Sequence, residues 1–298
     1  MPRLRVNQIA IEYDCFGSED AEPILLIAGL GAQMIGWSVP FCEALASHGY
    51  RVIRFDNRDA GLSTHLDDAP VPDMASVAAA RRRGDTPDVP YTLFDMAADT
   101  IGVLDELSIE RAHIVGRSMG GMIAQLVASG HPHRTLSLTS IMSSSGNPEN
   151  PSAAPEIMAL LTHRAPDPSE DESGFLAHRM AFSRSISGRG HPFDEASQRV
   201  QALAESRRAY NPSGFGRQIA AIAATGDCRV FLSGITAPTL VVHGSDDPLV
   251  PVAAAMDIAT NIRRAELSII QGMGHEIPPP FYQTIAAAIA ANARRAIR

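Results

Sequence analysis

Short runs of mostly apolar residues recur along this chain, and each leads through a turn into a segment with helical spacing. Such runs occupy residues 23–28, 112–115 and 238–244. Strands without polar alternation are typical of a parallel sheet whose two faces are both covered by helices. Residues 91–107 carry apolar side chains every three or four positions, which indicates an amphipathic helix. This alternation predicts a three-layer α/β fold, with a mostly parallel sheet flanked by helices.

Other segments continue the same alternation. Residues 6–13 have a period of two and predict an antiparallel edge strand. We expect further strands at residues 51–56, 136–143 and 265–270, and further helices at residues 37–48, up to 127, from 252 and at 281–293. Residues 64–90 form a long connection with little periodicity, and connections of that length tend to be functional or mobile.

The α/β alternation is interrupted in the second half of the chain. From about residue 144 to 225 there is no strand-like run, and the pattern predicts helices at residues 155–163, 172–186 and 193–209. We therefore expect three parts, namely a first core segment, a helical cap and a second core segment at residues 1–143, 144–230 and 231–298. Such an insertion usually covers the carboxyl edge of the sheet, where open α/β sheets bind ligands.

Composition excludes several classes of protein. The formal net charge of −8 argues against a nucleic-acid partner, and no apolar stretch approaches the roughly 20 residues of a membrane span. Three widely spaced cysteines, Cys15, Cys42 and Cys228, indicate reduced thiols in a cytoplasmic protein. The chain has no nucleotide fingerprint, and His131 with His133 has no further ligands nearby, so we expect neither cofactor nor metal. A monomer and a small homo-oligomer fit equally well.

The segment from Gly116 to Gly120 fits the pattern G-x-S-x-G, placed between a predicted strand and a predicted helix. This is the context of a nucleophile elbow, a turn so tight that side chains two residues either side of the nucleophile would clash. Ser118 would then stand at the start of a helix, where backbone N–H groups favour a developing negative charge. We predict that Ser118 is the nucleophile.

A serine hydroxyl needs a base, and the base needs a carboxylate to orient it. His275 directly follows the last predicted strand, and Asp246 and Asp247 follow the strand that ends near residue 243. The chain order Ser, Asp, His is the order of the α/β hydrolases. We predict His275 as the base, while spacing alone leaves both aspartates open. The N–H groups of Met119 and Leu30 are the expected donors to the oxyanion, each contributing about 3 kcal/mol.

The sequence resembles the α/β-hydrolase superfamily over nearly its whole length, and within it the capped esterases related to aclacinomycin methylesterase. The likeness is carried by residues 36–37, 51–64, 95–99, 116–120, 238–242 and 272–275. By this resemblance, Asp247 is the carboxylate of the triad. The predicted cap is the least similar segment, so the bulky substrate of that methylesterase does not carry over.

Two positions depart from the family pattern. Relatives often have His before the oxyanion glycine, whereas this chain has Ala28, so a hydrogen bond that braces the loop is missing or replaced. Arg117 stands before the nucleophile, where relatives often have His or Asn. Its cation either anchors an acidic group of the substrate or pairs with an acidic side chain beside the elbow. We favour the second, structural interpretation.

These observations predict a serine esterase that hydrolyses carboxylic esters of small apolar substrates through an acyl-enzyme. The same triad also serves lactonases, amidases, C–C bond hydrolases and perhydrolases, because a fold does not determine its chemistry. From another class, a non-catalytic receptor would use the capped pocket to bind a small molecule. Trp37 and Met142 are our candidates for substrate contacts.

Overall fold

A single eight-stranded sheet forms the centre of the computed structural model, which describes residues 2–297. Its strand order is β1-β2-β4-β3-β5-β6-β7-β8. The strands are β1 (Arg3–Val6), β2 (Ile9–Phe16), β3 (Glu22–Ile27), β4 (Tyr50–Phe55), β5 (Ala112–Arg117), β6 (Thr135–Ile141), β7 (Thr239–Gly244) and β8 (Glu266–Ile270). The β1–β2 and β2–β4 pairs are antiparallel and all the other pairs are parallel. The predicted fold class is confirmed.

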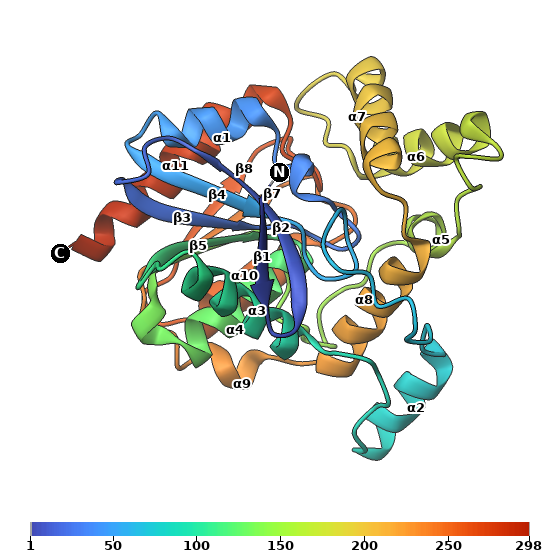
Figure 1. Cartoon of the computed structure of the whole chain (residues 1–298), viewed down its shortest axis with the longest axis horizontal. Helices are drawn as coiled ribbons and strands as arrows, with labels where there is room; N and C mark the ends of the chain where they lie inside the picture. Colours follow the sequence, from blue (N-terminus) through green and yellow to red (C-terminus); the bar gives the residue numbers. More distant parts are fainter. Residues whose placement is uncertain (1, 298) are drawn as a thin grey trace.

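Helices cover both faces of the sheet (Figure 1). One face carries α1 (Val39–Ala46) and α11 (Tyr282–Arg294), and the other carries α3 (Leu93–Glu106), α4 (Met119–Gly130), α9 (Arg229–Leu232) and α10 (Val252–Asn261). Short 3-10 turns are η1 (Met34–Gly36), η2 (Pro132–Arg134), η3 (Pro279–Phe281) and η4 (Arg295–Ile297). Successive residues of β3 alternate between the two cores, Leu25 facing α3 and α4, and Leu26 facing α1 and α11. The unbroken apolar run therefore reflects burial on both faces.

The amino-terminal edge of the sheet differs from the expectation of one strand at residues 6–13. Instead β1 and β2 form a hairpin, because Asn7 and Gln8 adopt positive φ angles of 45° and 70° and turn the chain. Positive φ at both central residues matches the right-handed twist of the flanking strands. Asn7 also donates from Nδ2 to Asp99 of α3 at 3.0 Å, which fixes the turn against the helix layer.

Four helices lie between β6 and β7, namely α5 (Pro155–Thr162), α6 (Glu172–Ile186), α7 (Glu195–Arg208) and α8 (Pro212–Thr225). The first three agree with the expected helices to within two residues. The helix α8 was not expected, although Asn211 caps its start and Pro212 occupies its first turn. Figure 1 shows α5, α6 and α7 projecting to one side of the sheet, while α8 lies between the sheet domain and the helix at residues 74–83.

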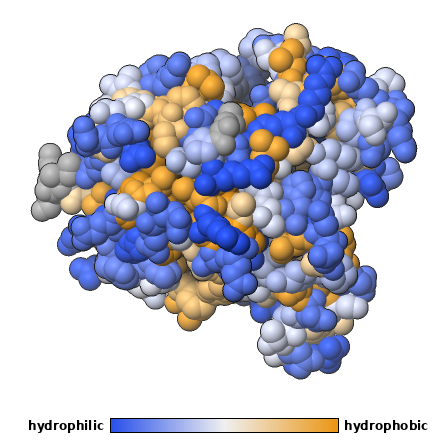
Figure 2. All heavy atoms as spheres, viewed as in Figure 1, coloured by the Kyte–Doolittle hydropathy of each residue, from blue (hydrophilic) through white to orange (hydrophobic). Residues whose placement is uncertain are grey.

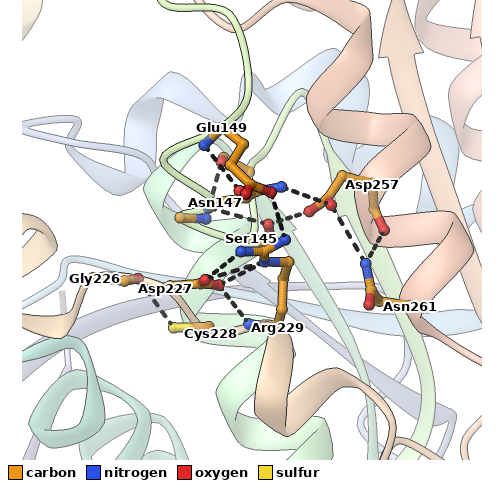
Figure 3. A network of polar contacts seen from close by, with 11 residues as sticks. Ser145, Asn147, Glu149, Gly226, Asp227, Cys228, Arg229, Asp257 and Asn261 are labelled. Atoms are coloured by element: carbon orange, nitrogen blue, oxygen red, sulfur yellow. Dashed lines mark hydrogen bonds and ion pairs between the residues drawn. The ribbon is translucent and has the colours of Figure 1, made fainter.

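The two segments that connect this insertion to the sheet domain meet near α10. The N–H of Cys228 donates to the carbonyl of Ser145 at 2.8 Å, so the outgoing and returning chains are hydrogen-bonded to each other. Asp257 of α10 accepts hydrogen bonds from Ser145 and, at 2.9 Å, from Asn147 (Figure 3). The base of the insertion is thus attached to the helix layer of the sheet domain.

The long connection at residues 64–90 contains one helix that was not expected, α2 (Met74–Arg83). Asp73 caps its start by accepting from the N–H of Ser76, and Gly84 ends it with a φ of 78°. This helix packs against α8 (Figure 1).

Elsewhere the surface is mostly polar. Figure 2 shows an apolar area near α9, where Phe231 contacts Phe94 edge to face. Across residues 2–297, no helix combines the length and hydropathy that crossing a bilayer requires.

Candidate active site

Ser118 occupies a strained turn between β5 and α4. Its backbone has φ 53° and ψ −125°, a conformation that L-residues rarely adopt and that is often found at functional sites. The flanking glycines are required by close approach. A Cβ on Gly116 would lie 2.0 Å from the carbonyl oxygen of Gly120, and a Cβ on Gly120 would lie 2.2 Å from that of Ile27. The G-x-S-x-G pattern therefore corresponds to contacts that leave no space for side chains.

The structure brings Ser118, His275 and Asp247 into one hydrogen-bonded chain. His275 Nε2 lies 3.0 Å from Ser118 Oγ, and His275 Nδ1 lies 2.7 Å from Asp247 Oδ2. With Nδ1–H donating to the carboxylate, Nε2 is free to accept the hydroxyl proton. Asp247 is buried, and its other oxygen accepts the N–H groups of Leu249 and Val250 at 3.0 and 2.8 Å. These bonds hold the carboxylate toward the imidazole.

The neighbouring Asp246 turns away from the histidine. Its Oδ2 accepts from the N–H and Nε of Arg189 at 3.2 and 3.0 Å, and its Oδ1 accepts from Ser245. The hydrogen bonds from Arg189 and Ser245 hold its pKa below the ordinary range. Of the two aspartates that spacing left open, the one in contact with His275 is Asp247.

A second histidine, His243, lies beside the carboxylate of Asp247 and was not expected from the sequence. His243, the fifth residue of β7, is fully buried and places Nε2 2.7 Å from the carbonyl of Val250 and 3.4 Å from Asp247 Oδ2. Burial lowers the pKa of His243, so the ring is neutral at pH 7 and donates Nε2–H to the carbonyl. The neutral His243 therefore packs against Asp247 without forming an ion pair with it, and the carboxylate stays paired with His275.

Two backbone N–H groups beside Ser118 have no acceptor among residues 2–297, those of Leu30 and Met119. Met119 is the first residue of α4, and the first N–H groups of a helix have no partner within it. Leu30 lies in the turn after β3 and is half-buried. Buried N–H groups are nearly always bonded, so this pair is available to an oxygen of a ligand.

The turn that carries Leu30 is held from both sides. On one side, Asn57 donates from Nδ2 to the carbonyl of Ala28 at 3.0 Å. On the other, Gln218 of α8 accepts the N–H of Gly31 and donates to the carbonyl of Arg58, both at 2.8 Å. Gln218 is completely buried. These bonds replace the brace that the Ala28 position lacks, and Gln218 was not foreseen because it lies 187 residues from its partner.

Both predicted substrate contacts lie in the core. Trp37 is 1% exposed and stacks on Phe41 with ring centroids 5.5 Å apart. Met142 is 2% exposed and directly follows β6 with a φ of 42°. Contact of either side chain with a substrate stays a prediction.

The expected pairing of Arg117 with an acidic side chain is wrong. No carboxylate among residues 2–297 lies within ion-pair distance of its guanidinium, which instead sits over the ring of Trp37, 5.1 Å from the centroid. The nearest acidic neighbour is Glu205 of α7, whose two oxygens bind Arg179 at 2.7 Å and Gln201 at 2.9 Å. Glu205 is thus already engaged with other partners.

Residues 2–297 contain no group of three or more His, Cys, Asp or Glu arranged to hold a metal ion. Cys15, Cys42 and Cys228 are free thiols, and burial raises the pKa of each.

Comparison with known proteins agrees with the class that the fold and the elbow define. Residues 22–279 match the family model described as alpha/beta hydrolase fold. The chain belongs to the alpha/beta hydrolase fold family and is a hydrolase of that family.

Among curated relatives, rhodomycin D methylesterase DnrP of Streptomyces peucetius is 28% identical over 312 residues, covering 97% of each chain. The putative carbamate hydrolase RutD of Variovorax paradoxus is 28% identical over 268 residues, covering 89% of each chain. Among solved structures, a meta-cleavage product hydrolase from Pseudomonas fluorescens is similar with a TM-score of 0.75 and 19% identity, over 99% of this chain and 98% of that one. An enol-lactonase from Burkholderia xenovorans has a TM-score of 0.68 and 22% identity, over 99% of both. These structural likenesses concern the fold.

Proposed function

We propose that this protein is a serine esterase that hydrolyses carboxylic esters of small substrates through an acyl-enzyme on Ser118. The observation that carries the proposal is the hydrogen-bonded chain from Ser118 through His275 to Asp247, set at a strained elbow beside two N–H groups without acceptors. The likeness to a relative named as a methylesterase supports the same choice of substrate class.

In the proposed first half-reaction, His275 Nε2 takes the proton of Ser118 as Oγ attacks the ester carbonyl carbon. The carbonyl oxygen gains the negative charge and accepts the N–H groups of Leu30 and Met119. Each such donor contributes about 3 kcal/mol of transition-state stabilisation. When the tetrahedral intermediate collapses, the C–O bond to the alcohol breaks, and His275 returns its proton to the leaving oxygen.

In the second half-reaction, water takes the place of the alcohol. His275 removes a proton from the water, the hydroxide attacks the acyl carbon, and the bond to Ser118 Oγ breaks as His275 reprotonates it. Asp247 stays ionised throughout. It accepts Nδ1–H, holds the ring in the required tautomer and stabilises the imidazolium.

The helical insertion at residues 144–230 is proposed as the cap of this site, with residues 1–143 and 231–298 as the core. Two contacts support that assignment: the bond from Gln218 to the turn after β3, and the bond from the N–H of His275 to the carbonyl of Ile186 at 2.8 Å. The free thiols are in keeping with a reducing, cytoplasmic location.

The proposal is tested by burst kinetics with p-nitrophenyl acetate. We expect a stoichiometric burst of nitrophenol followed by slower turnover in the native protein. In Ser118→Ala, both should be lost, with kcat reduced by a factor on the order of 10⁶. Ser47→Ala is a matched control, because Ser47 lies just before β4, at the opposite edge of the sheet from Ser118.

Equal turnover by Ser118→Ala and the native protein would overturn the assignment of the nucleophile. Saturable ester binding without turnover would instead indicate a receptor. Esterases and lactonases share the acyl-enzyme chemistry, so only the range of substrates distinguishes them. A screen of lactones with the native protein and Ser118→Ala therefore tests whether the protein is a lactonase.

A further inference from the structure

The side chain that precedes the nucleophile is a cation without a counter-ion. Most buried and half-buried arginines elsewhere contact a carboxylate, as in the pairs Arg54–Asp14 at 2.8 Å, Arg58–Asp99 at 2.6 Å, Arg208–Asp56 at 2.7 Å and Arg217–Asp59 at 2.7 Å. Within the described residues 2–297, the side chain of Arg117 has neither an ion pair nor a hydrogen bond. It is half-buried.

The guanidinium of Arg117 lies between the sheet domain and α7. On one side are the ring of Trp37 and the backbone at Gly36, where an added Cβ would come within 2.4 Å of Nη2. On the other side is Glu205, outside ion-pair distance. Arg117 is therefore half-buried between the sheet domain and the insertion.

The surroundings of Arg117 adjoin the proposed reaction site. The segment from Gly29 to Gly36 touches both groups, since a Cβ on Gly29 would lie 3.3 Å from Ser118 Cβ and one on Gly36 would meet Arg117. Arg117 and Ser118 are also consecutive residues, so their Cα atoms are about 3.8 Å apart.

A half-buried arginine without a hydrogen-bonded partner is costly. Burial lowers the pKa of Arg117, while the charge of Glu205 raises it, and the guanidinium nevertheless stays protonated at pH 7. Desolvated charges are stable only when they are paired and hydrogen-bonded. A bound anion would supply the acceptors that the chain does not, and the planar guanidinium matches the two oxygens of a carboxylate.

We propose that Arg117 binds a carboxylate carried by the substrate, which makes it a specificity-determining residue for esters or lactones of carboxylate-bearing acids. The inference rests on the proposed function for the position of the reacting ester. Glu205 favours a monoanion, because its nearby negative charge would repel a phosphate dianion more strongly than a carboxylate.

The first experiment measures binding without turnover. Trp37 is the only tryptophan of the chain and lies directly beneath Arg117, so its fluorescence reports on what happens at the guanidinium. In a Ser118→Ala background, monomethyl adipate should change the emission saturably, whereas the neutral dimethyl adipate should bind at least about tenfold more weakly. Adding Arg117→Gln should abolish that difference, and adding Arg117→Lys should preserve part of it.

Arg184→Gln is the matched control, because it removes a cation of α6 that is paired with Glu195 and exposed. It should leave the preference unchanged. If monomethyl adipate gives no saturable response, or gives the same response with Arg117→Gln, the inference is overturned.

The second experiment measures the ratio of kcat/KM for monomethyl adipate to that for dimethyl adipate. Arg117→Gln should lower this ratio by at least about tenfold relative to the native enzyme, and Arg117→Lys by less. An unchanged ratio overturns the role of Arg117. Loss of turnover in Ser118→Ala still tests the esterase mechanism independently. Turnover that survives Ser118→Ala overturns the proposed function instead, and the fluorescence titration still tests Arg117.

Discussion

The last helix of the insertion and the three before it are joined to the rest of the molecule in different ways. α8 buries residues along its whole length, including the charged Arg217 and the amide of Gln218. In α5 no residue is buried, while α6 and α7 share a small separate cluster formed by Phe175, Met180 and Ala202. In Figure 1, α8 lies along the sheet domain and the other helices extend beyond it.

This difference separates two tasks within one insertion. α8 holds the turn that carries Leu30 and is therefore part of the proposed catalytic framework. α7 instead contacts the core through polar groups around Gln33, Arg208 and Glu205, next to the open side of Arg117. We infer that α8 supports the chemistry and that α5, α6 and α7 determine which substrates reach it.

The largest effect should come from breaking the ion pair that attaches α8. Arg217 donates to both oxygens of Asp59 at 2.8 and 2.7 Å, and both side chains are almost completely buried. Although burial alone would raise the pKa of Asp59, hydrogen bonds from Arg217, Leu66 and Tyr91 hold it below the ordinary value. Arg217→Met would leave a buried carboxylate without its cation, and should lower the free energy of unfolding in urea by about 3–5 kcal/mol.

Arg184→Met is the control for that experiment, because its pair with Glu195 is exposed and should contribute less than about 1 kcal/mol. Combining Arg217→Met with Asp59→Asn should recover part of the loss by removing the stranded charge. A loss below about 1 kcal/mol for Arg217→Met would mean that this pair does not join α8 to the core.

A smaller effect, seen in catalysis, should follow from Gln218→Ala. The N–H of Gly31 would lose its acceptor, and the turn carrying Leu30 would be less well positioned for the oxyanion. We expect kcat for p-nitrophenyl acetate to fall by about tenfold with little change in KM, because the lost interaction acts in the transition state. Gln198→Ala, on α7, serves as the control. An unchanged kcat, or a rise in KM alone, would contradict this positioning role.

The parts of the site that lie directly after strands could be predicted from the sequence. Ser118 and Asp247 follow the buried strands β5 and β7, and His275 follows the edge strand β8. Parallel strands place their carboxyl ends at one edge of the sheet. Spacing alone could not decide between Asp246 and Asp247, and only the family resemblance favoured Asp247. The choice depends on the turn after β7, where the N–H groups of Leu249 and Val250 bind one carboxylate.

Contacts between the insertion and the core could not be predicted from the sequence for a different reason. Gln218 and Arg217 read as polar positions of a helix, and nothing in their local pattern indicates the partners that lie far away in the sequence. The helix itself was missed because its Gly and Ala residues weaken the periodic signal, although Asn211 and Pro212 mark its start. The pairing expected for Arg117 failed because composition offers many acids and only the fold shows which are already engaged.

The smallest effect on overall stability should come from the cluster that joins α6 to α7. Phe175 is buried there and meets Tyr210 edge to face, with centroids 6.1 Å apart. A buried Phe→Ala in a main core typically costs about 3–5 kcal/mol, and Phe41→Ala beside Trp37 should do so. Phe175→Ala should change the global free energy of unfolding by less than about 1 kcal/mol, because a separate cluster opens locally before the sheet unfolds.

Hydrogen exchange distinguishes the two kinds of opening. In Phe175→Ala, the amides of α6 and α7 should exchange faster while those of α8 stay protected, whereas Phe41→Ala should accelerate exchange throughout by destabilising the whole fold. If Phe175→Ala lowers the global free energy as much as Phe41→Ala does, the projecting helices and the sheet unfold as one cooperative unit. The division of tasks between α8 and its neighbours would then have no counterpart in their stability. It would have to rest on the contacts of Gln218 and Arg117 alone.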